Sequence, residues 1–477
     1  MQYEAVIGLE VHAQLATKSK LFCGDSTAFG ADPNTQVSPV TLAHPGTLPK
    51  VNATAIEYAI KMGLACHCGI TRETYFARKN YFYPDLPKGY QISQHTTPVC
   101  KGGYVSIKTA GGSRNVQLNR IHLEEDAGKS IHDIDDNFSC IDLNRAGTPL
   151  IEIVTEPDLF SAEEAWQYVT EIRKLVRWLG ICDGNMEEGS LRCDANVSIR
   201  PKGEKKLGTK VEIKNLNSIR NVRKAIEFEI ERMERLAGEG NPIIQQTRSF
   251  DASTDTTFAM RDKEEANDYR YFPDPDLAPI RLTQQYISRI EASLPPLPAE
   301  LTRQLQQQFG LNEYDAVQLC EDKSSYDYFS DVVQHTHHYK AVANWLLGPL
   351  RQYNNEHDTS FESIPLQPQA LAALIALVEN GSVSFSVASA KLLPALMEKN
   401  IDPLKAAEEM NLLQTNDTAA LETWINEALE SMPEKLAEYK KGKKGLIGLF
   451  AGEVKKRSRG KADPRLVMQL LEQKLNN

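Results

Sequence analysis

The sequence lacks the features that would assign it to several large classes of protein. Its 477 residues contain no apolar run near the roughly 20 residues that a membrane-spanning helix needs. The chain starts directly with a strand-like pattern, without a basic segment followed by an apolar one. We therefore expect no export or organelle signal and a cytoplasmic location. The eight cysteines are scattered, which favours a reducing compartment over a disulfide framework.

Familiar catalytic and metal signatures are also missing. Neither Gly-x-Ser-x-Gly nor His-Glu-x-x-His occurs, so the sequence indicates no serine nucleophile elbow and no zinc-protease helix. Gly128-Lys129-Ser130 imitates the end of a phosphate-binding P-loop, but that pattern requires glycine where the chain has Leu123. Cys66-His67-Cys68 offers three ligand atoms, yet no second pair follows at zinc-finger spacing, so we do not favour a metal there.

The overall charge is negative, but one stretch is strongly basic. A net charge of −10 argues against non-specific binding of polyanions by the whole molecule. Between residues 440 and 465, however, ten Lys and Arg residues stand against two acids. This stretch predicts a local basic surface that contacts phosphates, and the alternative is a solvated run of charge.

Periodicity divides the chain into a mixed part and a helical part. Strand and helix patterns alternate up to about residue 290, where Pro295, Pro296 and Pro298 follow closely. One helix is predicted from Ser161 to Gly180, because Ser161 and Glu164 form a capping box. Beyond the prolines the pattern is helical to the end, with a further boundary placed near 400–410.

One strand carries an unusual concentration of carboxylates. Residues 150–155 are apolar and β-branched, and strand alternation sends Glu152 to the face opposite Ile151 and Ile153. Arg145 precedes this strand, and further acids follow it. The segment therefore predicts a wall of a metal–nucleotide pocket, and the alternative is a solvated strand edge.

Three other stretches repeat this mixture of polar residues on a strand face. Glu10 and His12 lie two residues apart and so share one face, as do residues 192, 194 and 196. Glu124, Glu125 and Asp126 are adjacent carboxylates of the kind that hard cations such as Mg²⁺ prefer. The alternatives are exposed polar faces and an ordinary acidic turn.

Residues 75–94 interleave aromatic rings with cations on a segment that Pro84, Pro87 and Gly89 keep irregular. Aromatic rings beside cations favour stacking and phosphate contact with a nucleotide or an RNA end. The alternative is an aromatic loop packed on a sheet.

Seven motifs, in order, closely resemble the B subunits of heterotrimeric tRNA-dependent amidotransferases. They are IGLEVHAQL, RKNYFYPDLPKGYQISQ, EEDAGKS, LNRAGTPLIEIVTEPD, SLRCDANVS, EIKNLNS and DYRYFPDPDL. The basic tail is similar to the YqeY-type helical domain. The resemblance implies an α+β fold with three domains: a cradle around an antiparallel sheet over 1–290, a helical domain over 291–405, and a helical tail that binds tRNA over 406–477.

The resemblance also implies an activity, a glutamine-dependent carbon–nitrogen ligase reaction. Members phosphorylate the side-chain carboxylate of Glu-tRNA(Gln), and in many bacteria of Asp-tRNA(Asn), with ATP and Mg²⁺, and ammonia then displaces the phosphate. The implied partners are a glutaminase A subunit that supplies the ammonia, a small C subunit, tRNA and a non-discriminating aminoacyl-tRNA synthetase. The alternative is a tRNA-binding and assembly subunit without chemistry of its own. An archaeal-type relative carries a large inserted domain, for which 477 residues leave no room.

The resemblance assigns roles to residues as follows. The predicted catalytic residues are Glu10, His12, Glu125 and Glu152, and the same four with Asp194 are the predicted Mg²⁺ ligands. The residues predicted to bind ATP or the tRNA acceptor end are Lys79, Tyr81, Tyr83, Lys88, Tyr90, Arg145, Arg192, Asn196 and Lys214. The residues predicted to contact the tRNA body are Lys441, Lys443, Lys444, Lys455, Lys456 and Lys461.

The chain departs from the family pattern in one loop. Many members carry two cysteine pairs in the segment that here spans 23–41. This chain retains Cys23 but has Asp25, Ser38 and Thr41 at the other three places. Four thiolates make a structural zinc site and one does not, so we predict no zinc here.

Overall fold

The computed structural model describes residues 2–135, 137–262, 268–399, 401–414, 418–458 and 461–476. The chain forms two compact units, Met1–Leu297 and Pro298–Asn477. The first is built on a large, mostly antiparallel sheet with helices and the second is helical, so the predicted α+β class is confirmed. Within the described ranges, no helix combines the length and apolar character that crossing a membrane requires.

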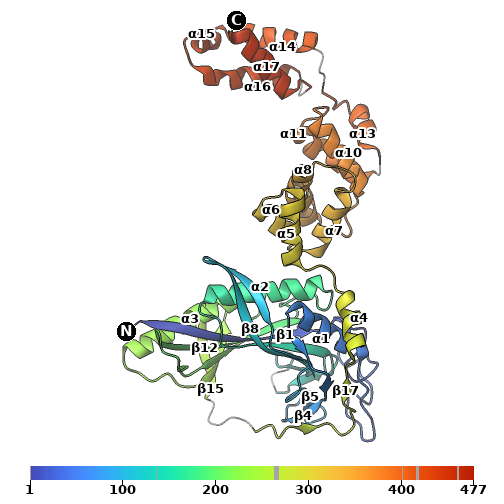
Figure 1. The fold of residues 1–477 in the computed structure, drawn as a ribbon, viewed down its shortest axis with the longest axis vertical. Helices are drawn as coiled ribbons and strands as arrows, with labels where there is room; N and C mark the ends of the chain where they lie inside the picture. Colours follow the sequence, from blue (N-terminus) through green and yellow to red (C-terminus); the bar gives the residue numbers. More distant parts are fainter. Residues whose placement is uncertain are drawn as a thin grey trace. The chain divides into compact units, whose positions relative to one another are not determined.

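The first unit is organised by a 13-stranded sheet (Figure 1). Across it the main path runs through β15 (Thr256–Asp262), β14 (Gln246–Asp251), β13 (Val211–Lys214), β12 (Leu191–Pro201), β1 (Tyr3–Gln14), β11 (Pro149–Thr155), β8 (Gly112–Glu125), β5 (Tyr90–Ser93), β4 (Ala77–Asn80) and β16 (Phe272–Pro273). Strands β13 and β14 run parallel, whereas β1 pairs antiparallel with both of its neighbours. Off this path lie β2 (Gly69–Ile70), β6 (Cys100–Lys101) and β7 (Tyr104–Thr109). Two small ladders complete the unit, β9 (Lys129–Ile131) with β10 (Cys140–Asp142) and β3 (Glu73–Thr74) with β17 (Ile280–Arg281).

Strand β1 shows how the sequence fixes the two faces of this sheet. Its apolar residues Ile7, Leu9 and Val11 are fully buried, while the intervening polar residues point the other way. The register places His12 opposite Glu152 on β11 and opposite Arg192 on β12. A slip of one residue would send the polar set into the core, so burial of the apolar face specifies the register.

Three helices cover the apolar face. These are α1 (Ala53–Ala65), α2 (Ala162–Trp178) and α3 (Ile219–Gly238), whose apolar residues share one core with the sheet. Each begins at a residue whose side chain accepts a backbone hydrogen bond: Asn52, Ser161 and Ser218. The helix predicted from the capping box is thus confirmed, and Gly180 follows it with a φ of +64°. Figure 1 shows α2 and α3 lying along the sheet, and α4 (Gln284–Ala292) packs against α1.

The second unit is a succession of short helices. They are α5 (Pro298–Phe309), α6 (Glu313–Leu319), α7 (Lys323–Val332), α8 (Tyr339–Trp345), α9 (Arg351–His357), α10 (Pro368–Glu379), α11 (Phe385–Val387), α12 (Leu393–Glu398) and α13 (Pro403–Glu409), with π-helical turns at Leu346–Leu350 and Ala388–Leu392. Four more follow, α14 (Thr418–Glu430), α15 (Pro433–Lys440), α16 (Ile447–Arg457) and α17 (Pro464–Asn476), and a 3₁₀ turn at Lys444–Leu446 precedes α16. These last four helices enclose a core of their own that includes Ile425, Phe450 and Leu471.

Candidate functional site

The face of the sheet opposite the helices is polar, and we call it the polar floor. Because side chains alternate along a strand, every strand that sends apolar residues to the helices sends its others to this face. From β13 to β4 the floor contains Glu212, Lys214, Asn196, Asp194, Arg192, Glu10, His12, Gln14, Glu152, His122, Glu124, Ser93 and Lys79. Most of the predicted site residues of the first unit therefore lie on one surface, although they come from several strands.

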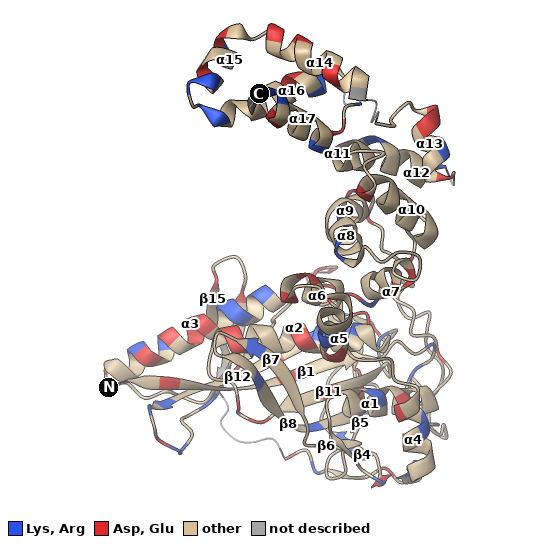
Figure 2. Ribbon diagram, turned by 45° about the horizontal axis from the view of Figure 1, so that its top comes forward, with Lys and Arg blue, Asp and Glu red and all other residues tan. Residues whose placement is uncertain are grey.

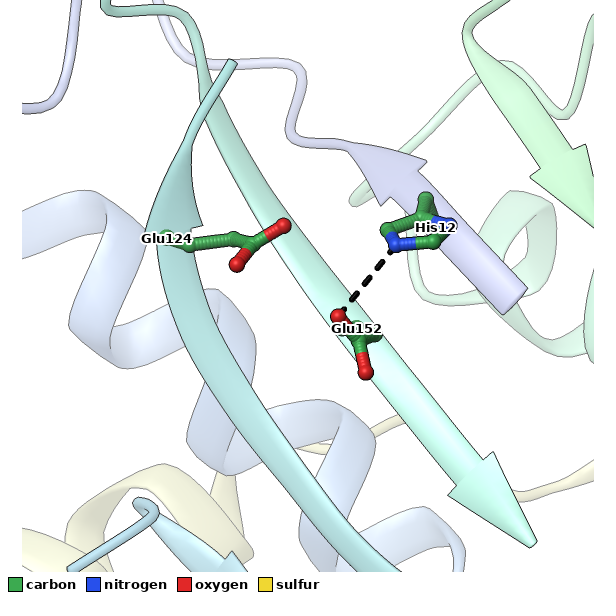
Figure 3. A group of neighbouring side chains, drawn as sticks. All are labelled: His12, Glu124 and Glu152. Atoms are coloured by element: carbon green, nitrogen blue, oxygen red, sulfur yellow. Dashed lines mark ion pairs between the residues drawn. The ribbon is translucent and has the colours of Figure 1, made fainter. Parts of the chain in front are cut away.

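Three of these side chains form a compact cluster, which we call the carboxylate cluster (Figure 3). One possible ligand atom each from His12, Glu124 and Glu152 lies within 4.8 Å of the others. The His12 Nε2 is 3.3 Å from a carboxylate oxygen of Glu152. The three residues stand on the neighbouring strands β1, β8 and β11, so sheet pairing alone brings them together.

A second histidine and an arginine extend the cluster. His122 Nε2 lies 3.5 Å from Glu124 and 3.6 Å from Glu152. Arg120 Nη2 is 3.8 Å from the other oxygen of Glu152, and Ser93 donates a hydrogen bond of 3.1 Å to Glu124. Sequence reasoning missed His122 and Arg120. It named Glu124 among the adjacent carboxylates suited to Mg²⁺ but did not include it in the final set of ligands. The alternation His122-x-Glu124 was the available signal, since it places both side chains on one face.

The cluster holds its carboxylates ionised. Burial by itself would lower the pKa of His12, but the hydrogen bond and charge of Glu152, aided by Glu124, raise it to about 9. Burial opposes ionisation of Glu152, yet the positive charge of His122 and the hydrogen bond from His12 hold its pKa well below the ordinary range. Two carboxylates with an imidazole form a donor set that suits a divalent cation.

Glu10 and Asp194 lie next to this cluster, not in it. They face each other across β1 and β12, and Asn196 donates a hydrogen bond of 3.0 Å to Glu10. Lys214 Nζ contacts Asp194 at 2.6 Å and Glu212 at 3.2 Å. Burial, followed by the charge of Glu152, raises the pKa of Glu10 above its usual value. Glu10 and Asp194, both predicted Mg²⁺ ligands, thus form a second charged group on the polar floor, together with the cation of Lys214.

Two predicted phosphate contacts meet near Asp126. Arg192 Nη2 lies 2.8 Å from its carboxylate, and Gln14 donates to the same oxygen at 2.7 Å. Arg145 donates to the carbonyls of Ala127 and Gly128 at 2.9 and 2.6 Å, so it fixes the turn that follows β8. Arg192 stays 37% exposed and accessible from the floor.

Glu125 points away from the cluster. Its carboxylate lies 2.8 Å from Lys88 Nζ and accepts the backbone N–H of Ile92 at 2.9 Å. Together with Lys20 and Tyr90 it lines a separate cavity of about 130 Å³. The structure therefore brings two predicted residues, Glu125 and Lys88, into one ion pair and does not bring Glu125 beside His12.

The remaining predicted residues lie at or near β4 and β5 and in the second unit. Lys79 Nζ lies 5.7 Å from the ring of Tyr81, and Tyr83 is 57% exposed, whereas the ring of Tyr90 packs 4.4 Å under the guanidinium of Arg78. The six tail lysines lie in the second unit, between the end of α15 and the start of α17. Figure 2 shows basic residues gathered at the turn after α15. Within this set, Lys443 contacts Glu438 at 3.0 Å and Lys461 donates to Asn411 at 3.0 Å.

The structure also brings together Cys23, Asp25, Ser38 and Thr41, the four positions of the loop over residues 23–41. Asp25 accepts the backbone N–H of Ser38 at 2.8 Å and the hydroxyl of Thr41, and Cys23 Sγ lies 3.4 Å from that hydroxyl. Although burial opposes it, these hydrogen bonds lower the pKa of Asp25. A hydrogen-bonded carboxylate therefore ties the two halves of this loop together.

Comparison with known proteins identifies relatives along the whole chain. The family model described as the GatB/GatE catalytic domain matches residues 5–288, and the one described as the GatB domain matches residues 327–475. The B subunit of an aspartyl/glutamyl-tRNA(Asn/Gln) amidotransferase from Geobacter sp. (strain M21) is 47% identical over 100% of both chains. The corresponding protein from Synechococcus sp. (strain JA-3-3Ab) is 46% identical over 100% of this chain and 98% of its own. That from Nitratidesulfovibrio vulgaris (strain DP4) is 47% identical over 99% of each.

Proposed function

The chain belongs to the family of aspartyl/glutamyl-tRNA(Asn/Gln) amidotransferase B subunits, and from this premise we propose that it performs the ATP-dependent chemistry of amide formation on tRNA. The substrate is glutamate esterified to tRNA(Gln), and aspartate esterified to tRNA(Asn) where that species is present. The carboxylate cluster on the polar floor supports this proposal most strongly, because the matched catalytic domain contains it entirely. The reaction would take place in the cytoplasm, where tRNA is charged.

The proposed reaction has two steps. First, an oxygen of the side-chain carboxylate attacks the γ-phosphorus of ATP, an acyl phosphate forms and ADP leaves. Second, the nitrogen of ammonia attacks the acyl carbon, the carbon–oxygen bond to phosphate breaks, and the nitrogen loses one proton. Both steps depend on positioning and on neutralising charge, so no covalent nucleophile on the protein is needed.

The residues of the cluster fit the divalent cation that such chemistry uses. His12, Glu124 and Glu152 would hold a hydrated Mg²⁺, with Glu10 close by on β1 and Asp194 on the neighbouring strand β12. When bound, this ion would neutralise the negative charge on the ATP phosphates. The fit rests on the donor set itself, in which two carboxylates and an imidazole approach within 4.8 Å of one another.

The cations of the polar floor would contact the phosphates of the substrate. Arg192 and Lys214 are each 37% exposed and flank the cluster on the β12 side, so a phosphate on the floor can reach both. Each is anchored by a carboxylate, Arg192 by Asp126 and Lys214 by Asp194, which fixes the side chain before substrate arrives. Such anchored donors lose little conformational entropy on binding.

Other subunits would complete the system. The sequence contains no glutaminase signature, so a glutaminase A subunit would release ammonia and a small C subunit would join the two. The basic residues of the tail would contact the tRNA body through its phosphates, which positions the tRNA without reading its sequence.

The test is an amidation assay on the full chain purified with its A and C partners. The assay uses Glu-tRNA(Gln) or Asp-tRNA(Asn), with glutamine or ammonium chloride, and with or without ATP. We expect amide formation only with ATP and from either nitrogen source. His12→Ala should abolish it with both sources, whereas His335→Ala, a histidine of the second unit, should not. Full activity of His12→Ala would favour the alternative of a non-catalytic subunit that binds tRNA and assembles the complex.

A further inference from the structure

Five aromatic rings form a continuous row at the β4 side of the polar floor. In order they are Tyr83, Tyr81, Tyr269, Tyr271 and His95, and the centroids of successive rings lie 6.1, 6.0, 6.1 and 4.0 Å apart. The first three contacts are edge-to-face, at 71°, 70° and 72°, and the last pair is parallel within 4°. In an edge-to-face pair the edge of one ring lies against the face of the other, so each such pair covers only one side of one ring. We call this set the aromatic row.

The backbone holds the row in place. Asn80, the last residue of β4, donates its N–H to the carbonyl of Tyr269 at 3.0 Å and its side-chain amide to the carbonyl of Arg270 at 2.9 Å. Arg270 itself has a φ of +45°, and its N–H bonds to the Asp268 side chain at 2.9 Å. Directly after Tyr271, β16 pairs with β4. Segments nearly 190 residues apart in sequence are thus joined so that their rings line up.

The rings are not a core cluster. Tyr83 is 57% exposed, His95 is exposed, and of the three rings between them none is fully buried. A tyrosine in the true core, Tyr168, is fully buried. Aromatic surface of this extent that stays accessible suggests a ligand.

A cation accompanies the row and links it to the carboxylate cluster. Lys79 Nζ lies 4.9 Å from the ring of Tyr269 and 5.7 Å from that of Tyr81. Lys79 stands on β4 two residues from Ala77, which pairs with Ser93, the donor to Glu124. A ligand lying along the row therefore has one part of its length beside the cluster.

We propose that the aromatic row binds the unpaired 3′ end of the tRNA by stacking its bases, with Lys79 neutralising a backbone phosphate. This inference rests on the proposed function, because it assigns the row to the tRNA substrate of that reaction. Successive rings beside a cation are how proteins bind single-stranded nucleic acid without reading its sequence. The row is five rings long and ATP has one base, so the row suits several consecutive nucleotides better than the ATP adenine.

The experiment replaces rings in the full chain assembled with its partner subunits. Tyr269→Leu and Tyr271→Leu remove a ring, while Tyr269→Phe and Tyr271→Phe retain it. Tyr286→Leu is the matched control, because Tyr286 is a half-buried tyrosine of α4 with the cation of Arg289 at 4.9 Å from its ring. Circular dichroism on each variant confirms folding.

Loss of a ring should raise the KM for Glu-tRNA by about 5- to 150-fold, the range that corresponds to the stacking of one base. The KM for ATP should stay near the wild-type value, and so should both constants in the phenylalanine variants and in Tyr286→Leu. A rise in the KM for ATP instead would assign the row to the adenine of ATP. Unchanged constants in the leucine variants, or an equal loss in the phenylalanine variants, would also overturn the proposal.

A second readout does not depend on catalysis. A tRNA with 2-aminopurine in its 3′ end should lose fluorescence when it binds the wild-type complex without ATP, because stacking quenches this base. The leucine variants should restore the fluorescence and the phenylalanine variants should not. If the wild type shows no ATP-dependent amidation, the proposed function fails, yet this measurement still decides whether the row stacks bases. Absence of quenching in the wild type would refute the inference alone.

Discussion

Glu124 and Glu125 are adjacent in sequence, but strand alternation sends their side chains to opposite faces of β8. Glu124 joins His12 and Glu152 on the polar floor, whereas Glu125 pairs with Lys88 on the other side of β8. Both carboxylates are nearly inaccessible, at 5% and 2% exposure, so each needs its partners. We infer that substitutions of the two residues will have distinguishable effects.

Glu124→Gln should lower the affinity for a divalent cation at least about tenfold, because it removes a charged ligand oxygen. Glu125→Gln should abolish ATP-dependent amidation even with free ammonia, but through the loss of the ion pair to Lys88, and should leave cation affinity closer to the wild type. Mn²⁺ titration followed by electron paramagnetic resonance measures the first effect, and the amidation assay measures the second. A larger loss of cation affinity in Glu125→Gln than in Glu124→Gln would return Glu125 to the metal site.

Part of the site can be predicted from the alternation of side chains along each strand. Alternation alone places Glu10 with His12 and sets Glu152 apart from the core. Alternation does not give the pairing of β8 with β11, which sets His122 opposite Glu152. That register depends on contacts between segments about 30 residues apart, so alternation can place His122 on the same face as Glu124 but cannot place it beside Glu152. Family resemblance indicated the chemistry of the site, and the sheet shows that Glu124, rather than Glu125, lies beside His12 and Glu152.

Among the elements, those that depend on local signals were the predictable ones. The helix that begins at Ser161 appears as expected, because a cap is decided within a few residues. The motif at residues 268–277 gave no prediction of a strand, yet this segment supplies β16 and two rings of the aromatic row. Its role comes from pairing with β4, and a distant partner leaves no local signal.

The loop over 23–41 is the element in which this chain differs from the family pattern. Its four key positions still converge, but Asp25 joins them through hydrogen bonds. The carboxylate accepts two donors, and each such bond contributes on the order of 1 kcal/mol. Because the four positions converge, we predict that four thiolates placed there would form a metal site in place of the hydrogen bonds.

We expect the purified wild-type chain to contain no stoichiometric zinc, because one thiolate at Cys23 does not hold the ion. The triple variant Asp25→Cys, Ser38→Cys, Thr41→Cys should take up about one zinc per chain, since four thiolates make a tetrahedral site. Plasma emission spectrometry of both proteins measures this. Zinc in the wild type would show that Cys23 and its neighbours bind the ion without four thiolates. No zinc in the triple variant would show that the four positions do not converge as a tetrahedral site requires.

At the scale of the whole molecule, the charge is divided between the two units. The first unit contains the polar floor, where acids and bases are paired, whereas basic residues crowd the last helices of the second. The described part of the tail has a core of its own, including Leu421 and Val454, that does not draw on the sheet. We therefore predict that binding of the tRNA body and chemistry at its end are separable.

Ending the chain at residue 414 should weaken tRNA binding and leave the ATP-dependent chemistry in place. Phosphate contacts dominate such affinity, so the dependence of binding on salt should also fall, by roughly 0.7 to 0.9 in logarithmic slope for each phosphate that the protein no longer neutralises. Charge removal in the full chain, with Lys441→Ala, Lys444→Ala and Lys455→Ala together, should reproduce part of this effect. Lys405→Ala, an exposed lysine of α13 outside the tail, is the control. Filter binding over a range of salt concentrations measures both quantities. Unchanged affinity for tRNA together with loss of ATP use would contradict this separation, because the tail would then contribute to the chemistry rather than to tRNA binding.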